Sequence, residues 1–212
     1  MGLRRITFPV GPLACNCSIL GDDASGTALL VDPGAEVGAI LDRLAAQHWK
    51  LQAILITHAH LDHIGGAAAL RRATGSPVWL NPRDRDLCGM LEMQAQWLGV
   101  PPPEPTELDA ELAPGARLAL AGTSLEVLET PGHTPGSVSL YVPSEALLFA
   151  GDTLFAGSVG RTDLPGGDGV ALQRSLRGQL LTLPDATAVV PGHGPLTTIG
   201  CERRSNPFLR RL

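Results

Sequence analysis

The stretch Thr57-His58-Ala59-His60-Leu61-Asp62-His63 decides how this 212-residue chain is organised, because it holds three of the six histidines and one aspartate. The run before it, Ala53-Ile54-Leu55-Ile56, is short, apolar and rich in isoleucine, which predicts a buried strand. Residues 64–73 after it predict a helix. A strand-to-helix crossing is a common place for a binding site in α/β proteins, so we expect one here.

The spacing within this stretch indicates metal ligands. Residues two apart in an extended segment face the same side, so His58 and His60 can face one ion. Asp62 and His63 follow as the chain turns, and they can face a second ion. Alternatively, Asp62 only caps the next helix and the histidines are solvated. Ligand-type side chains crowded in this way would desolvate and repel one another on protonation, and a metal removes that problem, so we favour the metal site.

Composition limits the class of protein. With 44% hydrophobic but only 4% aromatic residues, the core should consist mainly of Leu, Val, Ile and Ala. The net charge of −5 argues against nucleic-acid binding. No run approaches the roughly 18 apolar residues that a membrane span needs.

The cysteines are scattered and contain no Cys-x-x-Cys pair, which favours reduced thiols in a cytoplasmic protein over a disulfide framework. Cys15-Asn16-Cys17 resembles half of a metal site, but no matching half exists in the sequence. These residues are Cys15, Cys17, Cys88 and Cys201.

Apolar patterning and turn residues predict alternating strands and helices. The first three strands should form an antiparallel meander, and residues 137–142 and 146–150 a hairpin. Residues 82–98 should be helical in two pieces, with an apolar stripe that either packs in the core or covers the site as a lid (Leu87, Met90, Leu91, Trp97 and Leu98). The expected strands are 4–9, 15–21, 27–31, 53–56, 77–80, 125–130, 137–142, 146–150 and 187–190, and the other expected helices are 36–48, 64–73 and 169–182.

Ligand-type residues follow four of these apolar strands. His133 follows 125–130, Asp152 follows 146–150 and His193 follows 187–190. Each alone is an ordinary loop residue, but their shared placement indicates function. His48 lacks this placement, and we assign it no role. The predicted metal ligands are therefore His58, His60, Asp62, His63, His133, Asp152 and His193.

In kind and order these residues resemble those of the metallo-β-lactamase-fold hydrolases. The resemblance covers nearly the whole chain and implies an α+β fold, a four-layer αββα sandwich, as a single domain over residues 1–212. The site would lie at one edge of the sandwich. The resemblance also implies that Asp152 bridges two metal ions, one held by His58, His60 and His133 and the other by Asp62, His63 and His193.

Within this family, several segments resemble the glyoxalase II group, the hydroxyacylglutathione hydrolases. Arg161 falls where that group has a basic residue that contacts glutathione, so the resemblance makes it substrate-binding. The chain resembles the short form, because Gly194-Pro195 follows His193 where longer enzymes have a nearby tyrosine and a further helical region. Arg203, Arg204 and Arg210 either replace that region or form a solvated tail. The segments that carry the resemblance are 151–155, 160–161, 191–198 and 206–210.

The resemblance implies hydrolysis by a hydroxide shared between two divalent metals, with Asp62 and Asp152 as catalytic carboxylates. A small-molecule thioester such as S-D-lactoylglutathione suits this chemistry, because its thiolate, with a parent pKa of about 8.5, leaves without a strong general acid. We see no spare residue to protonate a leaving amine, which argues against amides. Histidine and aspartate ligands suit zinc, iron or manganese, and we favour zinc. Asp32 either orients a ligand histidine or is only a turn residue.

Other functions remain open on the sequence. A persulfide dioxygenase of the same fold would use one iron, held by His58, His133 and Asp152, and shares the stretch Gly160-Arg161-Thr162-Asp163. The ending Gly192-His193-Gly194-Pro195 favours the hydrolase. A nuclease fits the acidic balance poorly. A purely structural zinc is disfavoured, because such sites use about four ligands. The sequence does not indicate an oligomeric state.

Overall fold

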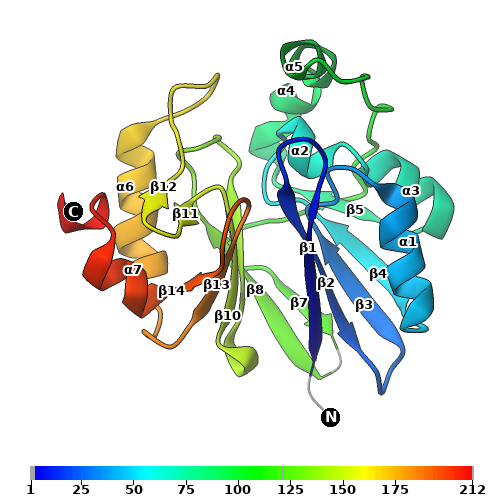
Figure 1. The fold of residues 1–212 in the computed structure, drawn as a ribbon, viewed down its shortest axis with the longest axis horizontal. Coiled ribbons are helices and arrows are strands. Elements are labelled where there is room, and N and C mark those ends of the chain that lie inside the picture. Colours follow the sequence, from blue (N-terminus) through cyan, green and yellow to red (C-terminus); the bar gives the residue numbers. More distant parts are fainter. Residues whose placement is uncertain (1–2, 121, 212) are drawn as a thin grey trace.

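The computed structural model of this protein describes residues 3–120 and 122–211. Over these residues two six-stranded sheets lie face to face, and helices cover their outer faces (Figure 1). The strand orders are β1-β2-β3-β4-β5-β6 and β14-β13-β10-β9-β8-β7. This arrangement confirms the expected αββα sandwich.

The first sheet is built by the N-terminal half of the chain. Its first three strands pair antiparallel, which confirms the predicted meander, and β3 to β6 pair parallel. Its strands are β1 (Arg4–Val10), β2 (Cys15–Asp22), β3 (Thr27–Val31), β4 (Lys50–Leu55), β5 (Val78–Leu80) and β6 (Ala110–Glu111). The helices of this half are α1 (Val37–Ala46), α2 (Leu61–Ile64), α3 (Ala67–Thr74), η1 (Pro82–Asp84), α4 (Arg85–Cys88) and α5 (Leu91–Leu98).

The second sheet is built by the C-terminal half. The predicted hairpin is confirmed, because β9 and β10 pair antiparallel. Its strands are β7 (Arg117–Leu120), β8 (Thr123–Glu129), β9 (Val138–Val142), β10 (Leu147–Gly151), β13 (Ala188–Pro191) and β14 (Thr197–Thr198), while β11 (Leu154–Phe155) and β12 (Ser158–Val159) form a separate ribbon. The helices are η2 (Pro143–Glu145), α6 (Gly169–Gly178), η3 (Leu180–Thr182), α7 (Ile199–Ser205) and η4 (Leu209–Arg211).

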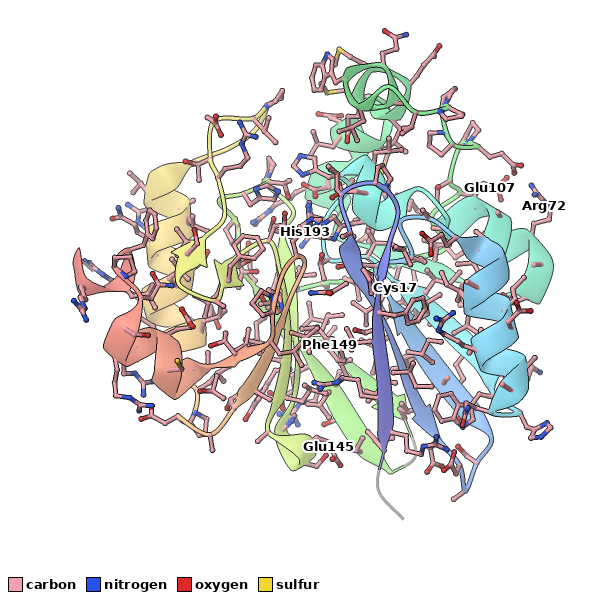
Figure 2. All side chains as sticks on the ribbon, viewed as in Figure 1. Cys17, Arg72, Glu107, Glu145, Phe149 and His193 are labelled. Carbon is pink, nitrogen blue, oxygen red and sulfur yellow. The ribbon has the colours of Figure 1, made fainter. Side chains whose placement is uncertain are left out.

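Successive apolar side chains of a strand belong to different layers of the core. In β3, Leu29 and Val31 belong to the core between the sheets, whereas Leu30 belongs to the core under the helices of the first half. Phe149 of β10, labelled in Figure 2, belongs to the same inter-sheet core. Because successive side chains of a strand point to opposite faces, a sheet covered on both faces requires continuous apolar runs.

One predicted helix is divided in two. Residues 64–73 were predicted as a single helix, but α2 and α3 are separated at Gly65-Gly66. A Cβ on Gly66 would lie 2.5 Å from the carbonyl oxygen of Pro33, so the chain approaches here too closely for a larger residue. The alternative in which Asp62 caps the helix is wrong, because His60 occupies the N-cap and Asp62 lies in the first turn of α2.

Other differences lie at the C-terminus and in short strands. The helix predicted to reach residue 182 ends at Gly178, and β6, β7, β11, β12, β14 and α7 were not predicted. Arg203 is not in a solvated tail, because it lies in α7, donates to the carbonyl oxygens of Leu181 and Leu183, and pairs with Asp185.

All four cysteines are free thiols, as expected. Throughout residues 3–120 and 122–211, no helix combines the length and apolar character needed to cross a membrane.

Candidate metal centre

Four strands bring the predicted ligands to one edge of the sandwich. The segment with His58 to His63 follows β4, His133 follows β8, Asp152 follows β10 and His193 follows β13. β8, β10 and β13 run in the same direction, because β9 pairs antiparallel with β8 and β10, and β13 pairs parallel with β10. Figure 2 shows His193 at the upper end of the two sheets. All seven predicted side chains meet there.

The histidines form two groups. In the first, ligand atoms of His58, His60 and His133 all lie within 4.8 Å of one another, and His133 Nε2 is 2.9 Å from His60 Nδ1. In the second, His193 Nε2 is 3.3 Å from His63 Nε2 and 3.0 Å from an oxygen of Asp62. The resemblance assigns the histidines of the first group to one ion, and Asp62, His63 and His193 of the second group to another.

Asp152 lies between the two groups. Its Oδ1 is 3.5 Å from His63 Nε2, and its Oδ2 is 3.5 Å from His133 Nε2. The backbone of the next strand end passes close by, because a Cβ on Gly192 would lie 2.0 Å from Asp152 Oδ1. A glycine at position 192 therefore lets the carboxylate occupy this central place.

The donor set fits divalent metal ions. His58 Nε2 and Asp152 Oδ1 are buried and have no hydrogen-bond partner among the described residues. Buried polar atoms are nearly always paired, so these two require a partner of another kind. Imidazole nitrogens and carboxylate oxygens are the ligands that zinc, iron and manganese accept.

Four histidines of the cluster have shifted pKa values, lowered for His58 and His60 and raised for His63 and His193. Burial, reinforced by neighbouring imidazoles, holds the pKa of His58 well below its ordinary value and lowers the pKa of His60 to about 3. Burial also opposes protonation of His63, but the surrounding carboxylates of Asp62, Asp152 and Asp32 raise its pKa well above the ordinary value. The pKa of His193 is likewise raised against its burial, by Asp62 and Asp152.

Metal binding should therefore release protons. The raised pKa of His63 favours its protonated form in the metal-free protein, and only a neutral imidazole binds a metal. We expect metal affinity to rise as the pH increases through the raised pKa values. Calorimetric titration of zinc in buffers with different ionisation enthalpies measures the protons released. His48→Asn, an exposed control, should release the same number, and the absence of any release would contradict the prediction.

Asp32 forms a hydrogen bond with His63 on the side away from the cluster. This contact agrees with the expectation that Asp32 orients a histidine of the site. Its Oδ2 lies 3.0 Å from His63 Nδ1, which donates to it and so leaves Nε2 facing the cluster. The same carboxylate accepts hydrogen bonds from the backbone N–H and the hydroxyl of Thr57, each at 2.7 Å. Such partners fix the tautomer and orientation of a ligand histidine.

Two further buried residues hold the ligand loops together and were not identified from the sequence. The Asp84 carboxylate accepts hydrogen bonds from the N–H groups of Ala59 and Gly136 and from the Thr134 hydroxyl, so it joins the His58 loop to the His133 loop. Gln94 accepts from the N–H of Leu61. Neither position lies in a recognisable motif.

Cys15 also contacts the cluster. Its Sγ lies 3.6 Å from His63 Nδ1, and a strand bridge joins Cys15 to His193. Burial raises the pKa of this thiol to about 12, so it is protonated at neutral pH. From the sequence we discussed Cys15 only as half of a possible metal site with Cys17. Cys17 is buried in the core.

A cavity of about 290 Å³ opens over the centre. His60, Asp62, His133, Asp152 and His193 line it, together with apolar residues of α4 and α5. Arg161, to which the resemblance gives a role in substrate binding, also lines it, and its guanidinium pairs with Asp163 at 2.7 Å. Arg203, Arg204 and Arg210 are not among the residues that line it.

A two-sheet sandwich with this histidine and aspartate cluster at its edge defines a class of metal-dependent hydrolases. The model of the metallo-β-lactamase superfamily matches residues 10–193, and the chain belongs to that superfamily. Its cluster accordingly implies divalent metal ions.

Similar proteins carry several names. Hydroxyacylglutathione hydrolase GloC of Haemophilus influenzae is 40% identical, over 95% of this chain and 96% of the relative. The structure of BLEG-1 B3 metallo-β-lactamase has a TM-score of 0.90 and 40% identity, covering 97% of this chain and 99% of that one. A di-iron-bound form of TTHA1623 has a TM-score of 0.88 and 43% identity, covering 96% and 100%. ETHE1 from Myxococcus xanthus has a TM-score of 0.80 and 29% identity, covering 98% and 84%.

Proposed function

We propose that this protein hydrolyses a small-molecule thioester, such as S-D-lactoylglutathione, at a centre of two divalent metal ions. The observation that carries the proposal is the position of Asp152 between two groups of histidines. The name of the relative GloC supports the substrate class. We assign one ion to His58, His60 and His133, the second to Asp62, His63 and His193, and Asp152 to both.

The bound ions would supply an activated water and polarise the substrate carbonyl. The chain itself holds the ligands in place: Asp32 fixes the tautomer of His63, and Asp62 Oδ2 lies 3.0 Å from His193 Nε2. Among the described residues that line the cavity, Arg161 is the only titratable group outside the proposed ligands. A guanidinium does not give up its proton, so the site favours a leaving group that departs unprotonated, as a thiolate does.

The test is thiol release from S-D-lactoylglutathione by the purified protein. We expect hydrolysis that is lost on chelation and restored by metal, with zinc, iron and manganese compared because a similar structure is di-iron-bound. Failure of the metal-loaded protein to hydrolyse any thioester would overturn the proposal.

The same purified protein should also be tested for persulfide oxygenation and for β-lactam hydrolysis. Persulfide oxygenation at one iron leaves Asp62, His63 and His193 without a role, although their side chains approach within 3.0 to 3.6 Å. We therefore expect no oxygen uptake with glutathione persulfide. The similarity to BLEG-1 B3 metallo-β-lactamase makes a β-lactam the matched amide substrate, and the lack of a proton donor in the cavity predicts slower cleavage of it.

A further inference from the structure

The cavity over the candidate metal centre has an apolar wall. In Figure 1, α4 and α5 stand on one side of the upper edge of the sheets, and the loop between β12 and α6 stands on the other. The exposed Trp97 and Leu98 of α5 line this cavity, as does the exposed Leu13 between β1 and β2. Met90, Leu164 and Pro165 extend the apolar surface.

This wall brings together apolar side chains that are exposed to solvent in the free protein. The described residues include seven exposed large hydrophobic side chains, and three of them, Leu13, Trp97 and Leu98, line this one cavity. Trp97 is 58% exposed, far more than a core tryptophan. When an apolar part of a ligand covers such a surface next to the reactive centre, the burial of apolar area favours binding.

The lining of the cavity offers few positively charged side chains to an anionic part of a ligand. Among the described lining residues, Arg161 is the only arginine or lysine. Its Nε and Nη2 donate to both carboxylate oxygens of Asp163, each at 2.7 Å. Gln94, the neutral polar residue of the lining, accepts from the N–H of Leu61. A carboxylate of a ligand would therefore find this arginine already paired with Asp163.

We propose that the substrate is a thioester with an extended apolar acyl chain, which lies against Trp97, Leu98 and Met90. This inference rests on the proposed function. The thiol parts of biological thioesters are polar, so the apolar wall suits the acyl part. In the reaction an oxygen from water forms the new C–O bond to the acyl carbon and the C–S bond breaks, which yields a carboxylic acid and the free thiol.

The first test compares acetyl, butanoyl and hexanoyl thioesters of N-acetylcysteamine, an uncharged thiol, and of glutathione. We expect kcat/KM to rise about twofold to fourfold per added methylene, by the same factor on both thiols. If the thioesters are hydrolysed but kcat/KM does not rise with acyl chain length on either thiol, this inference is overturned and the proposed function still stands. Failure to hydrolyse any of the thioesters, by protein shown to bind metal, would overturn both.

The second test locates the apolar contact. Trp97→Ala should reduce kcat/KM for the hexanoyl thioester about tenfold more than for the acetyl thioester. Phe208→Ala is the matched control, because Phe208 is 52% exposed and does not line the cavity. It should leave the hexanoyl-to-acetyl ratio unchanged. An unchanged ratio in Trp97→Ala would overturn the assignment of the acyl chain to this wall.

Discussion

Replacing Asp152 with alanine is expected to lower kcat/KM for thioester hydrolysis by about 10³-fold or more. The reason is the central place of its carboxylate, which lies 3.5 Å from a nitrogen of His63 on one side and of His133 on the other. Its removal takes a ligand from both proposed ions at once. Metal content per chain should fall together with activity, and both are measured on the same purified variant.

The control for this variant is Asp42→Ala, which removes an exposed aspartate on α1. It should retain the metal content and kcat/KM of the unmodified protein. Asp152→Asn keeps the shape but not the charge, and should also lose most activity. A fully active Asp152→Ala protein would contradict both the assignment of this residue and the proposed function.

The position of the candidate site could be predicted because its ligand-type residues have recognisable local signals. His58, His60, Asp62 and His63 are within six residues of one another, and the other three ligand-type residues each follow a recognisable apolar strand. Strands that run in the same direction end at the same edge of a sheet, so residues at their ends meet. The resemblance to a known family then supplied the sandwich, which the strand pattern alone did not determine.

The supporting residues could not be predicted, because their contacts join distant parts of the chain. Asp84 reaches partners 25 to 52 positions away, and Gln94 reaches Leu61 across 33 positions. Nothing local distinguishes them from polar residues on a helix surface. By contrast, α7 had a local signal, because the Thr198 hydroxyl caps the helix by accepting from the N–H of Cys201.

Replacing Asp32 with asparagine is expected to reduce metal affinity and kcat/KM by about 10- to 100-fold. Asparagine suits the left-handed backbone at this position, where φ is 51°, so the fold should be preserved. An amide NH₂ in place of Oδ2 would face His63 Nδ1, which now donates to that oxygen. In the neutral imidazole that binds a metal, Nδ1 would then have to accept, and the proton would lie on Nε2, the atom that faces the candidate centre. The measurements are zinc affinity by competition with a chelator and kcat/KM at saturating metal.

Thr57→Val separates this effect from a general loosening of the buried network. It removes the hydroxyl that donates to Asp32 Oδ2 and lies 3.1 Å from His58 Nδ1, but leaves the contact between Asp32 and His63 intact. Loss of these two hydrogen bonds should lower the free energy of unfolding by about 2 kcal/mol and change metal affinity less than Asp32→Asn does. Equal losses of affinity in the two variants, or normal affinity in Asp32→Asn, would contradict a role for Asp32 in setting the tautomer of His63. Because Asp32 lies outside the proposed ligand set, a selective loss in Asp32→Asn would show that the orientation of His63, and not only its presence, determines metal binding.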